Sequence, residues 1–147
     1  MTSRQANNPS APLSTPRLRL KPKGSRPGHV DGAWWPTTPD LADSASDLLP
    51  VLAVRLGQPM RVSYNIDSWT ATPRRISVGG LSARLGGYHR QPVDTIDITG
   101  RTGDRLTLLV VPTGTAPAAA HDIIMAAAHA ENTQSAQQLL HDSPDRG

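Results

Sequence analysis

The alternation of apolar and polar residues between positions 61 and 111 is the feature that most constrains the fold. A period of two puts apolar side chains on one face of a β-strand and polar side chains on the other. Glycine pairs and a glycine-rich loop separate the alternating segments and predict hairpin turns between them. The alternating segments are 61–66, 75–78, 81–85 and 95–99, and turns are expected at 79–80, 86–87 and 100–104. This stretch therefore predicts an antiparallel sheet.

Two further segments extend this sheet. Residues 106–111 are apolar on both faces, which is typical of a central strand or of one that a helix covers. Residues 17–21 alternate as RLRLK and predict a short edge strand with its two leucines inward. Arg17, Arg19 and Lys21 then point outward, where charges discourage pairing with another sheet edge. In total, about five or six strands are expected.

The segment that precedes the sheet shows helical spacing. Its leucines predict a short turn near 40–46 and a helix near 48–56, with Asp47 as the N-cap. Gly57 is expected to end this helix, because glycine is common just past a helix C-terminus. Residues 22–39 are predicted to form a loop.

Two more helices are expected after the sheet, one capped by Thr115 and a shorter one near 136–140. Together these elements predict an α+β domain over residues 17–141, in which the C-terminal helices cover one side of an antiparallel sheet. A partly open β-barrel is the main variant. Residues 1–16 are polar and proline-rich, so they and residues 142–147 are expected to be disordered tails.

The charge of the chain is uneven. The formal net charge is +3, but residues 1–30 carry six basic side chains and no acidic one, whereas residues 31–147 carry nine basic and twelve acidic ones. The pattern predicts a basic arm on a mildly acidic body. The absence of cysteine excludes disulfides, thiolate metal sites and cysteine nucleophiles. No apolar run suggests a membrane span or a secretory signal, so a soluble cytoplasmic protein is expected.

The most distinctive candidate site is the tryptophan pair Trp34 and Trp35 with the nearby Asp31. Neighbouring residues of an extended chain point to opposite sides, so one ring can be buried while the other stays near the surface. A surface ring could stack on a base or a sugar, or anchor a partner. The alternative is that both rings fill the core, because the chain has five aromatic residues and no phenylalanine. Asp31 is expected to hold the loop by a turn or cap hydrogen bond.

A basic sheet face is the second candidate. Arg61, Arg75 and Arg84 fall on polar positions of the alternation, as Arg17 and Arg19 do on the first strand. If these strands are neighbours, their guanidinium groups form one patch that could bind phosphates. The alternative is an ordinary solvated sheet face, since acidic residues of the same face dilute the charge.

The remaining chemistry-bearing residues form no catalytic or metal-binding motif. The closest histidines on one predicted helix, His121 and His129, are eight positions apart, whereas a shared metal needs a spacing of three or four. No helix follows the glycine pairs to direct its N-terminus at a phosphate. The serines lack the G-x-S-x-G setting of a nucleophile. No catalytic residue, metal or cofactor is therefore predicted.

Several short tracts resemble one known family. They are RLRLKP (17–22), VDGAWWP (30–36), DL (40–41), RLG (55–57), PRR (73–75) and LLVVP (108–112), of which VDGAWWP is the specific one. Together they resemble an uncharacterised family of high-GC bacteria, domain of unknown function 5994, over roughly residues 16–141. The preference for arginine over lysine agrees with such codon usage. The resemblance implies no catalytic residue, ligand or cofactor.

These observations leave three hypotheses open. The leading one is a non-enzymatic binding or accessory domain with an unidentified partner, because a catalytic constellation is missing and the tryptophan loop is distinctive. The first alternative is a domain that binds nucleic acid or another polyanion through the basic first strand and the sheet-face arginines. The second alternative is an enzyme of unknown class with a scattered site.

Overall fold

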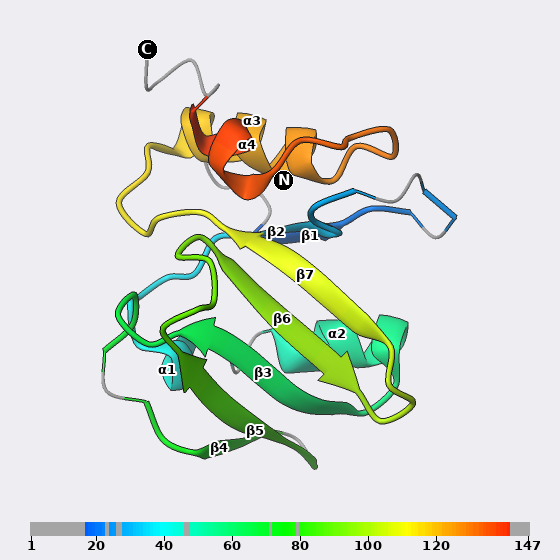
Figure 1. Cartoon of the computed structure of the whole chain (residues 1–147), viewed down its shortest axis with the longest axis vertical. Helices are drawn as coiled ribbons and strands as arrows, with labels where there is room; N and C mark the ends of the chain where they lie inside the picture. Colours follow the sequence, from blue (N-terminus) through cyan, green and yellow to red (C-terminus); the bar gives the residue numbers. More distant parts are fainter. Residues whose placement is uncertain are drawn as a thin grey trace, which may run out of the picture.

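The computed structural model describes residues 17–22, 24–25, 28–45, 48–70, 72–78 and 80–141 (Figure 1). Within them the strands are β1 (Leu18–Leu20), β2 (Gly32–Trp34), β3 (Pro59–Asn65), β4 (Arg75–Val78), β5 (Leu81–Tyr88), β6 (Thr95–Gly100) and β7 (Arg105–Val110). The helices are α1 (Leu41–Ala45), α2 (Leu49–Leu56), α3 (Pro117–Ala127) and α4 (Ala136–His141). The strands form one sheet in the order β1-β2-β7-β6-β3-β5-β4.

The α+β class is confirmed, but the sheet is mixed and not antiparallel throughout. Two of its pairings are parallel, β2 with β7 and β3 with β5. The second follows from the β4–β5 hairpin: β4 lies at the edge of the sheet, and β5 returns between β4 and β3. Because β1 and β4 lie at the two ends of the strand order, the sheet is open.

The strand that the sequence did not predict is β2, which lies inside the expected loop 22–39. It is three residues long, and all three are buried. It therefore lacks the alternation of apolar and polar residues that reveals a half-exposed strand. Its position between β1 and β7 comes from pairings with segments that are distant in the sequence.

Helices cover both faces of the sheet, which corrects the expected cover on one side. One core contains residues of α1 and α2 together with Val62, Ile98 and Leu108 of the sheet. A second core joins α3 and α4 to Trp35 and Leu109 at the β2–β7 end. Leu108 and Leu109 thus point into different cores, as the apolar character of both faces of β7 predicts.

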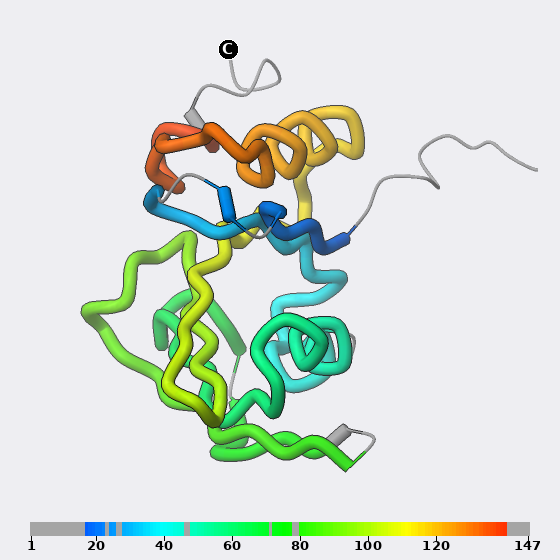
Figure 2. Tube along the Cα trace, turned by 90° about the vertical axis from the view of Figure 1, so that its right-hand side faces the viewer, coloured from blue at the N-terminus to red at the C-terminus, as the bar shows by residue number. Residues whose placement is uncertain are grey.

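The second face is bare beyond the reach of α3 and α4. Figure 2 shows α2 on one side of the sheet, and no helix of the described residues covers the other side of β3, β5 and β6. We call this surface of β3, β4, β5 and β6, together with the start of β7, the open face. Its outward residues include Arg61, Ser63, Arg84 and Asp97, all exposed or half-buried.

The helix ends follow the sequence in part. Gly57 ends α2 with a φ of 73°, as predicted. The N-cap of α2 is Leu48, which forms no side-chain cap hydrogen bond, so the prediction of Asp47 as the cap is wrong. Asp47 itself and the two predicted terminal tails lie outside the described residues. The N-cap of α3 is Ala116 and not Thr115, because Pro117 takes the first helical turn.

Two glycines lie inside β5, which corrects the turn predicted at this pair. Gly87 lies opposite Tyr64 of β3, and a Cβ on Gly87 would come within 2.9 Å of that ring. On the other face, a Cβ on Gly86 would come within 3.1 Å of the hydroxyl of Tyr88. Each glycine therefore gives space to a tyrosine ring. The turn predicted at 79–80 is confirmed, because β4 and β5 form a hairpin around Gly80, whose φ of 83° suits glycine.

Candidate functional site

Four arginines form a row across the open face. Arg75 of β4 lies opposite Arg84 of β5, and Arg84 lies opposite Arg61 of β3. Arg61 lies opposite Thr99 of β6, which in turn lies opposite Arg105 of β7. We call Arg75, Arg84, Arg61 and Arg105 the arginine row. The structure thus brings together the three sheet arginines that the sequence predicted on neighbouring strands.

The guanidinium groups of the arginine row are exposed. Arg75 Nη1 donates a hydrogen bond to Ser82 Oγ at 3.0 Å, and Arg61 Nη2 donates one to the hydroxyl of Tyr88 at 3.0 Å. Across the described part of the chain, no carboxylate lies within 4 Å of a guanidinium nitrogen of the row. The positive charge of the row is therefore not neutralised by a neighbouring acid.

This arrangement has an electrostatic cost. Like charges directly opposite each other on neighbouring strands destabilise a sheet, on the order of 0.2–1 kcal/mol per pair. Arg84 has an arginine on each side. A guanidinium stays protonated in proteins, so the repulsion is not relieved by loss of a proton. An anion that lies across the row would remove this cost and receive several charge-assisted hydrogen bonds.

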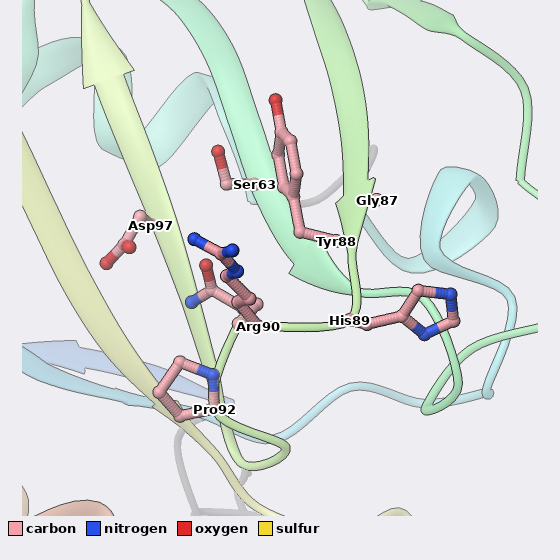
Figure 3. Close-up of a pocket in the computed structure, with 8 residues that line it drawn as sticks. Ser63, Gly87, Tyr88, His89, Arg90, Pro92 and Asp97 are labelled. Carbon is pink, nitrogen blue, oxygen red and sulfur yellow. The ribbon is translucent and has the colours of Figure 1, made fainter.

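A hollow of about 590 Å³ opens beside the row on the same face. Its lining includes Ser63, Tyr88, Arg90 and Asp97. Figure 3 shows the ring of Tyr88 next to Ser63, and the guanidinium of Arg90 directed toward Ser63 and Asp97, whereas His89 points away. The hollow thus combines an aromatic ring with a hydroxyl, a cation and a carboxylate.

The sequence reasoning missed three members of this surface. Arg105 directly precedes the apolar run of β7, so the alternation could have placed it on a polar position beside Arg61. Tyr88 and Arg90 were missed because the strand was expected to end at Gly86. No signal in the sequence showed that β5 continues past its two glycines.

One comparison with known proteins identifies the family of this chain. The matching model is that of a family of unknown function, DUF5994, over residues 17–127, which include every strand and the first three helices. The chain belongs to DUF5994. The resemblance noted in the sequence is thereby confirmed. No curated protein and no solved structure matches the chain.

Arg17 and Arg19 do not join the arginine row of this DUF5994 chain. They lie at or next to β1, at the sheet edge opposite β4. The guanidinium of Arg17 lies 4.1 Å from the centre of the Trp35 ring, and its Nη1 donates a hydrogen bond to the Trp35 carbonyl at 3.4 Å. Arg19 is exposed. The predicted patch therefore separates into two groups of arginines on opposite edges of the sheet.

Lys21 corrects the outward orientation predicted for the first strand. Lys21 is only 4% exposed, and its Nζ donates a hydrogen bond to the carbonyl of Asn132 at 2.6 Å. A buried ammonium group needs such a partner, because an unpaired buried charge is costly. The side chain links the start of the sheet to the segment between α3 and α4 and is unavailable to a polyanion.

Trp34 and Trp35 are both buried in the DUF5994 fold, at 3% and 7% exposure. They enter the two different cores, on opposite faces of the sheet, as neighbouring residues of a strand should. Trp34 also stacks on Trp69, with ring centres 5.7 Å apart. These positions agree with the core-filling interpretation, and a ligand could stack on either ring only by displacing core contacts.

Asp31 has a structural partner in the neighbouring strand. Its carboxylate accepts a hydrogen bond from the backbone N–H of Thr107 at 2.8 Å, and its own N–H donates to the Thr107 carbonyl at 2.7 Å. These contacts hold the start of β2 against β7. They match the predicted loop-holding role, although the bonded partner is a strand and not a turn.

One histidine lies beside a carboxylate at the surface. His89 Nδ1 lies 3.2 Å from the carboxylate of Asp67, and both side chains are more than 70% exposed. Within the described ranges, no group of three or more histidine, aspartate or glutamate side chains could hold a metal ion. The described helices also include none that is long and apolar enough to cross a membrane.

Proposed function

We propose that this DUF5994 domain is a binding module for polyanions and that the arginine row is its contact surface. The observation that carries the proposal is the cross-strand register, which places four exposed arginines at one level of the sheet. Among the described residues, none of the four has a carboxylate within 4 Å of its guanidinium nitrogens. Arginine is suited to this task because its planar group donates bidentate hydrogen bonds to phosphate. The open face supports binding of a chain-like ligand, because no described helix covers it.

The geometry of the row suits a ligand with regularly spaced charges. Neighbouring strands of a sheet lie about 4.8 Å apart, so the backbone positions of Arg75, Arg84 and Arg61 follow one another at roughly this interval. Arg105 lies two strands further on, across Thr99. The row therefore spans about 19 Å, or four strand spacings. A single small anion would contact only part of it.

The net negative charge of residues 31–147 does not prevent an anion from binding at the arginine row. The Debye length is about 8 Å at physiological ionic strength, so acids elsewhere on the surface are largely screened from a ligand in contact with the row. One acid of the same face, Asp97, lies opposite Ser63, two residues along the strand from the level of the row. Binding is thus expected to depend on these four residues and not on the net charge.

Fluorescence anisotropy with fluorescein-labelled inorganic polyphosphate, measured over a range of sodium chloride concentrations, tests the proposal. Affinity should fall with salt, and a ligand that contacts the whole row should give a log–log slope of about −3, by analogy with single-stranded nucleic acids. Arg84→Gln should weaken binding and flatten this slope. Arg19→Gln removes the same charge at the opposite sheet edge and is the matched control.

Two results would contradict the proposed surface. One is binding that does not depend on salt. The other is an equal loss of affinity in Arg84→Gln and Arg19→Gln, which would mean that only net charge matters.

A further inference from the structure

The ring of Tyr88 is an aromatic surface on the open face, next to the arginine row. Its residue is 43% exposed. The ring lies over Gly86, where a Cβ would come within 3.2 Å of ring atom Cε2. Its hydroxyl accepts the hydrogen bond from Arg61 Nη2 at 3.0 Å. The ring is thus supported by the strand beneath it and held at its tip by a member of the row.

The hollow next to this ring offers hydrogen-bonding groups of several kinds. The hydroxyl of Ser63 forms no hydrogen bond with another described residue. One carboxylate oxygen of Asp97 accepts from the hydroxyl of Thr107, and Arg90 is exposed at the rim. In Figure 3 these three side chains and Tyr88 border the same space. A flat ring placed against Tyr88 would meet donors and acceptors at its edge.

The aromatic ring, the hydrogen-bonding groups of the hollow and the arginine row together fit one class of polyanion. Inorganic polyphosphate has charges but no flat apolar group, so it would contact the arginine row and would have nothing to stack on the ring of Tyr88. The bases of a duplex are already stacked on each other and are not available to a side chain. An unpaired base has a free face for stacking and an edge for hydrogen bonds, and its backbone supplies phosphates.

We infer that the polyanion is a single-stranded nucleic acid, with its phosphates on the arginine row and one base stacked on Tyr88 at the mouth of the hollow. This inference rests on the proposed polyanion binding and names its ligand class. Base stacking on an aromatic side chain tolerates any sequence, because every base has such a face. The domain is therefore expected to prefer single strands over duplexes without a strong preference for sequence.

Anisotropy with fluorescein-labelled oligothymidylate, compared with labelled polyphosphate at the same salt concentration, tests the inference. Tyr88→Ala should weaken oligothymidylate binding about 5- to 150-fold, the fold-change that corresponds to the loss of one stacked base. It should weaken polyphosphate binding no more than Tyr88→Phe does, because both variants lose the hydroxyl that accepts the hydrogen bond from Arg61. Tyr88→Phe keeps the ring and should retain the oligonucleotide affinity, whereas Tyr88→Leu keeps an apolar side chain of similar reach and should lose it.

The outcomes separate the inference from the proposal on which it rests. Equal loss of both ligands in Tyr88→Ala, or no loss of either, would overturn the role of the ring while leaving polyanion binding in place. Equal binding of a duplex and a single strand would also overturn it. If neither probe binds with a dependence on salt, polyanion binding itself fails. Circular dichroism of each variant confirms that the fold is retained, and Tyr88→Leu decides the matter if Tyr88→Ala unfolds.

Discussion

Two pairs of arginine and aromatic residues on this sheet have opposite surroundings. At one end, Arg17 lies over the ring of Trp35, which is 7% exposed and enclosed by α3 and α4. Further along the sheet, Arg61 donates a hydrogen bond to Tyr88, which is 43% exposed on the open face, beyond the reach of α3 and α4. An arginine next to an aromatic ring therefore closes a core in one place and offers a surface in the other.

The difference shows that residue type alone does not mark a binding site. The Trp35 ring is unusual in the sequence, but its packing area is already used by the protein itself. The Tyr88 ring is inconspicuous in the sequence, but its area remains available. Cover by a helix decides between the two cases, and cover depends on how segments far apart in the chain are arranged.

The largest expected effect separates the two aromatic rings by stability. Trp35→Ala should lower the free energy of unfolding by about 3–5 kcal/mol, because it removes a large buried ring and leaves a cavity. Tyr88→Ala, at the exposed position, should cost less than about 1 kcal/mol. Urea denaturation followed by circular dichroism measures both. Similar losses in the two variants would mean that the open face is part of the core.

The second prediction compares the two groups of arginines by binding. Arg61→Gln combined with Arg84→Gln should weaken polyphosphate binding about 10- to 30-fold at 0.1 M salt, because two fewer counterion-releasing contacts form. The salt slope should flatten from about −3 to about −1.5. Arg19→Gln should change either quantity little. A stronger effect at Arg19 than at the row would move the binding surface to the β1 edge.

Much of the open face follows from the sequence. A period of two is a local property, so it correctly placed Arg61, Arg75 and Arg84 on the polar sides of three strands. Their alignment in one row needed the register between strands, which depends on the path of the chain. The antiparallel prediction was wrong for β3 and β5, because the β4–β5 hairpin at the edge brings β5 back parallel to β3.

Three other features of the fold could not be predicted from the local sequence pattern, each for a physical reason. Buried on both faces, β2 shows no alternation. The glycines of β5 imitate a turn signal, although they provide space for the rings of Tyr64 and Tyr88. The alternation predicts that Lys21 points outward, but its ammonium group donates a hydrogen bond to the backbone carbonyl of Asn132. In each case a contact with a distant segment overrides the local pattern.

The third prediction tests the contact between Arg17 and the buried ring of Trp35. Arg17→Gln should lower the free energy of unfolding by about 0.5–1 kcal/mol, because the contact of a cation with the face of a tryptophan is lost. The glutamine side chain keeps part of the aliphatic cover. Polyanion affinity should stay close to that of the wild-type protein at 0.15 M salt, where distant charges are screened. Loss of affinity with unchanged stability would reverse the assignment of this pair to the structure.

The smallest expected effect is on stability and concerns the arginine row. Arg84 lies opposite Arg61 on one neighbouring strand and opposite Arg75 on the other, so Arg84→Gln removes one charge from two like-charged cross-strand pairs. The free energy of unfolding should rise by a few tenths of a kcal/mol and by no more than about 1 kcal/mol. The gain should shrink as salt is added, since salt already screens the repulsion between exposed charges.

The same substitution should weaken polyanion binding, so stability and affinity change in opposite directions. That opposition is expected where a fold keeps an unfavourable cluster of charges for a ligand, because the ligand removes the repulsion on binding. A lower stability of Arg84→Gln at low salt would mean that the row holds the sheet together through its own contacts. Thermal unfolding of the wild-type protein with and without polyphosphate adds a second measurement. The ligand should raise the wild-type melting temperature by more than that of Arg84→Gln, because ligand binding stabilises the folded state according to its affinity.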